Sequence, residues 1–148
     1  MMTIATTGVY SFKNVKVIYG NFQIEGFGEE ADDHVVITPK QDVVTQLVSS
    51  DGQNVIRNVI ADETAEVTIK LLANSQSNLF LTSQYYLLTK ELIDPAFPFT
   101  LFDVNGYVKA SGTNVVQTGL PVINEGSTSQ IREWKLLISN LLMTVGPL

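Results

Sequence analysis

The stretch that decides the fold runs from residue 43 to residue 60 and reads VVTQLVSSDGQNVIRNVI. Its apolar residues come in adjacent pairs, which fits neither the strict alternation of a half-buried strand nor the stripe of a helix. The pattern mirrors itself about Asp51-Gly52, and Asp-Gly favours a two-residue hairpin loop. Folded there, apolar residues oppose apolar ones and polar residues oppose polar ones, as cross-strand pairing favours. The opposed apolar pairs are Val48 with Val55, Leu47 with Ile56, Val44 with Val59, and Val43 with Ile60.

Such a ribbon carries apolar patches on both faces, because successive side chains of a strand point to opposite sides. It could be an interior strand pair of a sandwich. It could also be a long ribbon that packs against neighbouring subunits, since exposed apolar patches mark protein contacts. We expect the second arrangement, in which the hairpin at 43–60 and the neighbouring strand at 64–72 contact other subunits. The candidate interface residues of the hairpin are Val43, Val44, Leu47, Val48, Val55, Ile56, Val59 and Ile60.

The segments on either side of this hairpin also read as strands. Residues 9–28 contain two β-rich runs around Gly20-Asn21, residues that tolerate the positive φ of a hairpin loop. Residues 34–38, HVVIT, form a short β-rich run before Pro39. Residues 64–72, TAEVTIKLL, alternate apolar and polar side chains, which predicts a strand with one face in the core.

Residues 74–93, NSQSNLFLTSQYYLLTKELI, change to a helical period. Ser75 or Ser77 can cap the N-terminus of this helix, and Pro95 and Pro98 end it. The apolar stripe consists of Leu81, Tyr85, Leu88 and Leu92.

The C-terminal third returns to strands. Residues 99–104 and 107–111 flank Asn105-Gly106, a strong hairpin signal. A separate strand-like run follows at 113–122, and then a polar turn. Residues 130–145 carry Trp134, Leu136 and Ile138 on one strand face, with Trp134 as a core anchor, although the length of this segment also suits a helix.

Composition excludes several classes of function. The 148 residues are 45% hydrophobic and 16% charged, as expected of one globular domain, with a net charge of -6 and no basic patch for nucleic acid. Cysteine is absent, so there is no thiolate chemistry. We expect no signal peptide and no membrane span.

The chain has no Cys–His pair, no G-x-S-x-G, and no D-x-D-x-D-G calcium loop. The glycines at 26 and 28 precede acids, not a helix, which argues against a phosphate loop. The one histidine, His34, reads as a solvated loop residue beside two acids. We therefore expect no enzyme, no cofactor and no metal.

Three stretches together resemble a known family. They are YSFKNVKVIYGNFQIEGFG at 10–28, SSDGQNVIRNVIADETAEVTIKLLANSQSN at 49–78 and REWKLLISNLLMTVG at 132–146. Their order and spacing resemble the tail tube proteins of contractile-tailed bacteriophages, a family related to the Hcp-type tubes of injection systems. The resemblance spans nearly the whole chain.

The resemblance implies one tail-tube domain over residues 1–148, mainly β, a β-sandwich or half-barrel with one flanking helix on its outer side. It implies a non-enzymatic subunit whose hexameric rings stack into the inner tail tube, through which DNA passes during ejection. Its partners would be itself and the sheath, tape-measure and baseplate proteins. The protein would be made in the host cytoplasm and located in the virion tail. A net acidic chain suits this conduit, because like charge keeps DNA off the wall. Acidic candidates for the lumen or the ring interface are Glu29, Glu30, Asp32, Asp33 and Glu66.

The alternative function is a baseplate or tail-tip adaptor of a phage, or a carbohydrate-binding β-sandwich module. A glycan-binding module would expose aromatic side chains in a groove. The candidates for such a groove are Tyr85, Tyr86 and Tyr107.

Overall fold

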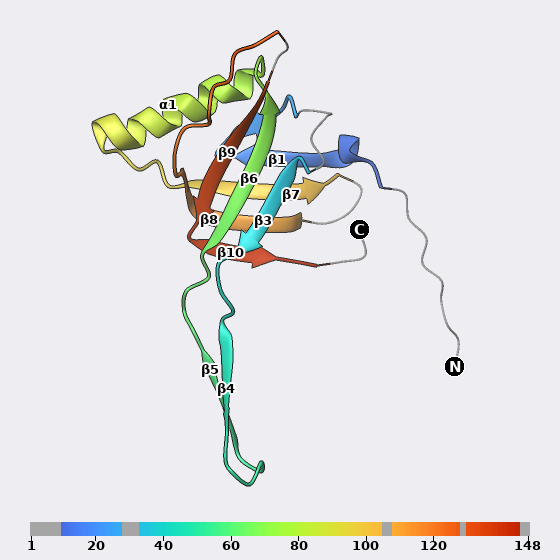
Figure 1. The fold of residues 1–148 in the computed structure, drawn as a ribbon, viewed down its shortest axis with the longest axis vertical. Coiled ribbons are helices and arrows are strands. Elements are labelled where there is room, and N and C mark those ends of the chain that lie inside the picture. The colour runs from blue at the N-terminus through green and yellow to red at the C-terminus, as the bar shows by residue number, and fades with distance from the viewer. Residues whose placement is uncertain (1–9, 28–32, 105–107, 128–129, 146–148) are drawn as a thin grey trace.

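A computed structural model describes residues 10–27, 33–104, 108–127 and 130–145. The described chain is mainly β, with an eight-stranded antiparallel sheet, a separate two-stranded sheet and one α-helix (Figure 1). The predicted fold class is confirmed. The elements are a 3-10 turn Phe12–Asn14, β1 Val15–Tyr19, β2 Phe22–Ile24, β3 Val35–Pro39, β4 Val44–Val48, β5 Val55–Val59, β6 Ala65–Leu72, α1 Gln76–Glu91, β7 Phe97–Asp103, β8 Val108–Gln117, β9 Ile131–Ile138 and β10 Asn140–Met143.

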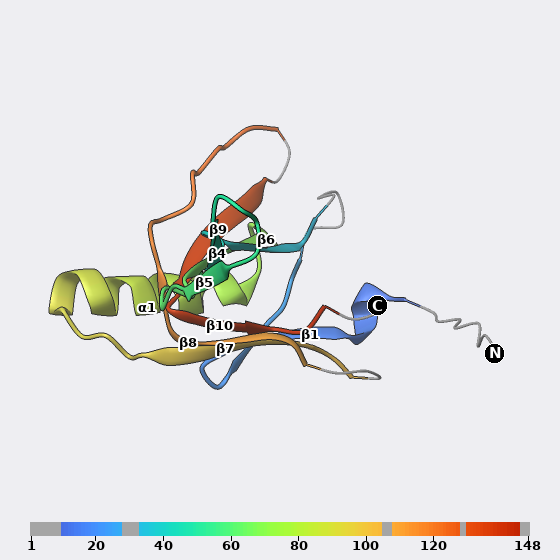
Figure 2. The ribbon, with the colours of Figure 1, turned by 90° about the horizontal axis from the view of Figure 1, so that it is seen from below.

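The large sheet folds over on itself at β8. Its strand order is β2-β1-β7-β8-β9-β6-β3, and β10 pairs with β8. The first part of β8 pairs with β7 and β10, and its last residues, Val116 and Gln117, pair with β9. Strands β9, β6 and β3 therefore form one layer that crosses the layer of β1, β7, β8 and β10 (Figures 1 and 2).

The core lies between these two layers. In β6 the predicted alternation is confirmed, because Ala65, Val67, Ile69 and Leu71 are fully buried. In β9 Trp134 is buried as predicted, and Leu136 and Ile138 share its face. The largest side chains that the other layer contributes to this core are Tyr19 and Phe99.

The run at 107–111 and the run at 113–122 were predicted as separate strands, which is wrong. Residues 108–117 of these runs form one strand, β8, and residues 118–122 lie outside any strand. β8 is irregular where Asn114 adopts φ 54° and where its register with β7 shifts. Gly112 lies at a close approach, since an added Cβ would clash with Cγ2 of Ile138. The turn residues Asn105 and Gly106 lie outside the described residues, but the strands that they join are paired as expected.

Segment 130–145 is two strands and not a helix. β9 ends at Ile138 and β10 begins at Asn140, with one residue between them. β9 pairs with β6 over its whole length, whereas β10 crosses to the other layer and pairs with β8.

The helix α1 begins where predicted, because the hydroxyl of Ser75 accepts a hydrogen bond from the N–H of Ser77 at 3.2 Å. It ends at Glu91, since Leu92 adopts a left-handed φ of 55°. Leu92 was predicted on the buried stripe, which is wrong: the chain leaves the helix there and the side chain is 84% exposed. The buried residues of the helix are Ser77 and Leu81.

Polar contacts attach this helix to the sheet. The indole N–H of Trp134 donates to Oδ1 of Asn78 at 2.9 Å, and Nε2 of Gln117 donates to the carbonyl of Leu81 at 3.1 Å. At the first turn, the N–H of Glu25 donates to the hydroxyl of Ser77. The helix is therefore held against both layers at one end of the molecule (Figure 1).

Candidate functional site

The hairpin at 43–60 forms in the register that the mirror pattern predicts. β4 and β5 pair antiparallel, and the N–H of Ile60 donates to the carbonyl of Val43 at 2.7 Å. The opposed pairs are Val44 with Val59, Thr45 with Asn58, Gln46 with Arg57, Leu47 with Ile56, and Val48 with Val55.

The turn of this hairpin differs from the prediction. The N–H of Gly52 donates to the carbonyl of Ser49 at 2.9 Å and Gly52 has φ 75°, so the turn is centred on residues 50 and 51. The loop is therefore longer than the expected two residues. The carboxylate of Asp51 accepts hydrogen bonds from the hydroxyl of Ser49 and the N–H of Gln53, which stabilises this turn. These bonds also hold the pKa of Asp51 below its ordinary value.

The hairpin projects from the body along the long axis of the molecule (Figure 1). β4 and β5 pair only with each other, and both are exposed over their whole length. The exposed fraction reaches 78% at Val59 and 65% at Leu47, and Val43 at the base is half-buried. An interior strand pair is thus excluded, and the ribbon is exposed on both faces. Its role as a subunit interface stays a prediction.

An exposed ribbon of this composition is costly without a partner. A two-stranded hairpin alone is marginally stable in water. Covering one exposed Val, Leu or Ile side chain contributes about 1.5–3 kcal/mol. Arg57 and Asp51 are the charged residues of the segment, and Arg57 lies midway along one face. The geometry suits docking into apolar surface more than it suits any chemistry.

The apolar surface continues from the base of the hairpin onto β10. A groove of about 330 Å³ separates the two elements. On β10 and just beyond it, Leu142 is 74% exposed and Val145 is 86% exposed. The sequence interpretation missed this surface, because an apolar run such as LLMTV reads as core. The groove is lined by Pro39, Gln41, Val43, Glu63, Thr64, Leu141, Leu142 and Met143.

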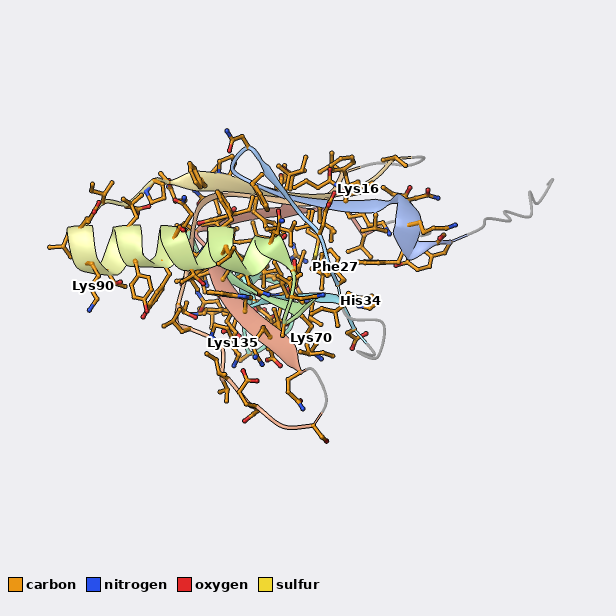
Figure 3. The ribbon with its side chains drawn as sticks, turned by 90° about the horizontal axis from the view of Figure 1, so that it is seen from above. Lys16, Phe27, His34, Lys70, Lys90 and Lys135 are labelled. Carbon is orange, nitrogen blue, oxygen red and sulfur yellow. The ribbon has the colours of Figure 1, made fainter. Side chains whose placement is uncertain are left out.

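Of the five acidic candidates the structure describes two, Asp33 and Glu66, and they do not form one site. Asp33 is exposed just before β3, and Glu66 lies on the face of β6 that points away from the core. That face is mixed in charge, since Lys70 follows on β6 and Lys135 of β9 pairs opposite Thr68 (Figure 3). Whether either acid lines a lumen stays a prediction. Glu29, Glu30 and Asp32 lie outside the described residues.

His34 was predicted to be a solvated loop residue, which is wrong. It is half-buried, with its ring 4.5 Å from the ring of Phe12 and 6.0 Å from that of Phe27 (Figure 3). The rings of Phe12, in the 3-10 turn, and of Phe27, after β2, pack against it, so that it serves as a packing residue.

Other expected chemistry can be checked over residues 10–27, 33–104, 108–127 and 130–145. In these ranges, no three His, Cys, Asp or Glu residues gather as metal ligands. Within the same ranges no helix is long and apolar enough to cross a bilayer. Of the aromatic candidates, Tyr85 is half-buried with its ring 5.5 Å from that of Tyr86. Tyr107 lies outside the described residues.

Comparison with known proteins gives structural matches only. No family model and no curated protein matches the sequence. Among solved structures, the fold is similar to a chain of the anti-feeding prophage cap, a tube-terminating cap, with a TM-score of 0.58, 11% identity, and 98% of this chain and 97% of that chain covered. It is similar to a chain of the sheath/tube terminator of the extracellular contractile injection system PVC, with a TM-score of 0.57, 12% identity, and 95% and 100% covered. A chain of the PVC sheath–tube complex matches with a TM-score of 0.52, 13% identity, and 90% and 89% covered. At these identities the likeness shows a shared fold.

Proposed function

We propose that this chain is a non-enzymatic, self-assembling structural subunit of a contractile, tail-like injection particle, located in a ring at the end of its tube. The observation that carries the proposal is the projecting hairpin with apolar side chains on both faces. A single domain over residues 1–148 is part of the proposal. Its partners would be further copies of itself and the tube and sheath proteins.

The structural matches support a position at an end of the tube. The two matches with the higher TM-scores come from a tube-terminating cap and a sheath/tube terminator. Both are covered nearly end to end, so that no large addition to the fold separates them from this chain. A position at the end of the tube fits the role of an adaptor at a tail end better than the role of a repeating tube subunit.

A second candidate is the repeating subunit of the tube itself. The match to the sheath–tube complex and the three stretches at 10–28, 49–78 and 132–146 favour it. In that case hexameric rings would stack without limit, and in a phage tail the cargo would be DNA. The two candidates therefore differ in whether assembly stops at one ring.

Electron microscopy of the concentrated, purified protein distinguishes the two candidates, with mass measured in parallel at low concentration. Closed rings that do not lengthen as the concentration rises support the terminal subunit. Long hollow tubes support the repeating subunit instead. A protein that stays monomeric, both alone and when mixed with tubes of a contractile injection particle, contradicts both.

The hairpin contact is tested by the double variant L47D/I56D. These side chains are opposed in the hairpin and are 65% and 61% exposed, and neither belongs to the core, so the packed body of the monomer should keep its stability. Each carboxylate would be desolvated in a covered interface, so we expect the assembled fraction in sedimentation to fall by at least about tenfold. The matched control is L79D/L92D, which places two carboxylates at exposed leucines of the helix region. Normal assembly of L47D/I56D would rule out the hairpin as an interface.

A further inference from the structure

A second groove lies at the other end of the molecule, away from the hairpin. Its volume is about 260 Å³, and it runs between α1, the segment before β9, and β9 itself. Tyr86 and Thr82 border it from the helix, and Pro121 and Ile123 border it from the segment. Tyr86 is 42% and Ile123 is 69% exposed, so apolar surface is open to a partner here.

Among the residues that the structure describes, Arg132 is the only charged one that lines this groove. It occupies the row of β9 that points into the core, two residues before the buried Trp134. Apolar side chains fill the rest of that row, and the Arg132 side chain is only 12% exposed. An almost buried guanidinium is costly unless acceptors surround it.

The guanidinium of Arg132 has fewer hydrogen-bond acceptors than it has donors to satisfy. Nη2 lies 3.4 Å from Oε1 of Glu125, a long contact to a side chain that is 82% exposed. Nη1 is buried and has no hydrogen-bond acceptor in the described part of the chain. Glu125 shows that a carboxylate reaches this guanidinium from solvent, but it engages only one of the two terminal nitrogens.

We propose that this groove binds an acidic, apolar segment of a partner protein. One carboxylate of the partner takes the place of Glu125 at Nη2, and the guanidinium turns so that Nη1, buried in the free protein, meets the second oxygen in the two-point geometry that guanidinium and carboxylate favour. An apolar side chain next to it lies between Tyr86 and Ile123, over Trp134. A neutral or basic segment would leave Nη1 of Arg132 without an acceptor, so the charge of the groove selects an acidic partner.

The test uses two blocked tripeptide amides as probes, acetyl-Leu-Glu-Leu-amide and its uncharged match acetyl-Leu-Gln-Leu-amide. Trp134 is the only tryptophan of the chain and lines the groove, so its indole N–H resonance and its fluorescence report binding there directly. We expect a saturable shift with the Glu peptide and at least about tenfold weaker binding of the Gln peptide, as for loss of a charge-assisted pair. The variant R132Q should bind both peptides equally weakly.

The variant K90Q is the matched control, because Lys90 is an exposed cation near the end of α1 that does not line the groove. It should keep the preference for the Glu peptide. Equal binding of the two peptides to the unaltered protein would overturn the proposal, as would a preference that survives in R132Q or a Trp134 signal that does not respond. If R132Q does not fold, the peptide pair on the unaltered protein decides the question alone.

Discussion

At the scale of one residue, Tyr19 places a hydroxyl group in the core and satisfies it with a hydrogen bond. Its ring is fully buried, and its hydroxyl donates to the carbonyl of Val115 at 2.9 Å, across the core. Burial raises the pKa of Tyr19 to about 12, and the nearby Asp94 adds to this effect. The neutral hydroxyl is thus the form that the folded state favours.

The pH dependence of stability follows from this shift. Unfolding returns Tyr19 to its ordinary pKa of 10.0, so its contribution is complete below pH 10 and is lost as the pH rises towards 12. We expect the free energy of unfolding to fall by about 1–2 kcal/mol over that window. Urea titrations at pH 8, 10 and 11.5 measure it.

The variant Y19F should lose about 1 kcal/mol at pH 8, because the carbonyl of Val115 loses its partner, and should show a shallower fall above pH 10. Y10F is the control for the removal of a tyrosine hydroxyl, since the Tyr10 side chain is 54% exposed. Identical slopes for Y19F and the unaltered protein would show that Tyr19 does not titrate in this way.

At the scale of the element, the hydroxyl of Ser75 makes two hydrogen bonds at the first turn of α1, one within the helix and one to another segment. The Ser75 hydroxyl accepts from the N–H of Ser77 and donates to the carbonyl of Glu25 at 2.6 Å, so one side chain both caps the helix and joins it to the segment after β2. We expect S75A to lower the free energy of unfolding by about 1–2 kcal/mol.

The control for this prediction is S83A. Ser83 is exposed within the same helix and donates only to the carbonyl of Leu79, one turn earlier. Its removal should change stability by less than about 0.5 kcal/mol, measured by the same thermal or urea unfolding. Equal effects of S75A and S83A would mean that the cap does not anchor the helix.

Elements with a strict pattern are predictable from this sequence. The alternation in Ala65–Leu72 and the mirror symmetry about Asp51-Gly52 each specify one register, since a slip of one residue would put polar side chains opposite apolar ones. The turn itself was not predictable in the same way, because it depends on side-chain hydrogen bonds to Asp51. The continuity of β8 depends on one backbone angle, at Asn114.

Surfaces are less predictable than strands. The apolar residues at 141–145 read as core, because composition does not say which side of a strand another layer covers. The groove at Arg132 depends on α1 packing beside two segments that come much later in the sequence, at 120–123 and 132–134. An arginine among the core-facing residues of a strand indicates a candidate binding site. It can be recognised only once it is known which side of the strand faces the core.

At the scale of the whole molecule, the protein divides into a packed body and a projecting hairpin. The core residues are contributed by the two crossing layers and the helix, and none comes from β4 or β5. Local stability follows buried contacts, so the hairpin should open far more readily than the body.

Hydrogen exchange measures this division directly. In dilute monomer, the amides of β4 and β5 should exchange at least about a hundredfold faster than those of β6 and β9. In assembled particles the same hairpin amides should slow by at least about tenfold, because their side chains become covered. Hairpin amides that are already protected in the monomer would contradict the proposed role, as would amides whose exchange is unchanged on assembly.

The way the hairpin joins the body has a mechanical meaning. Its strands connect through residues 40–43 and 60–64 to β3 and β6, which are neighbours in the sheet and slant down towards the hairpin (Figure 1). A pull on the hairpin along the long axis therefore loads β3 and β6 lengthwise, and the hydrogen bonds to β9 along the whole of β6 resist it together. A pull across that axis would peel β3 from β6 one bond at a time. The molecule should therefore resist a pull along its hairpin better than a pull across it.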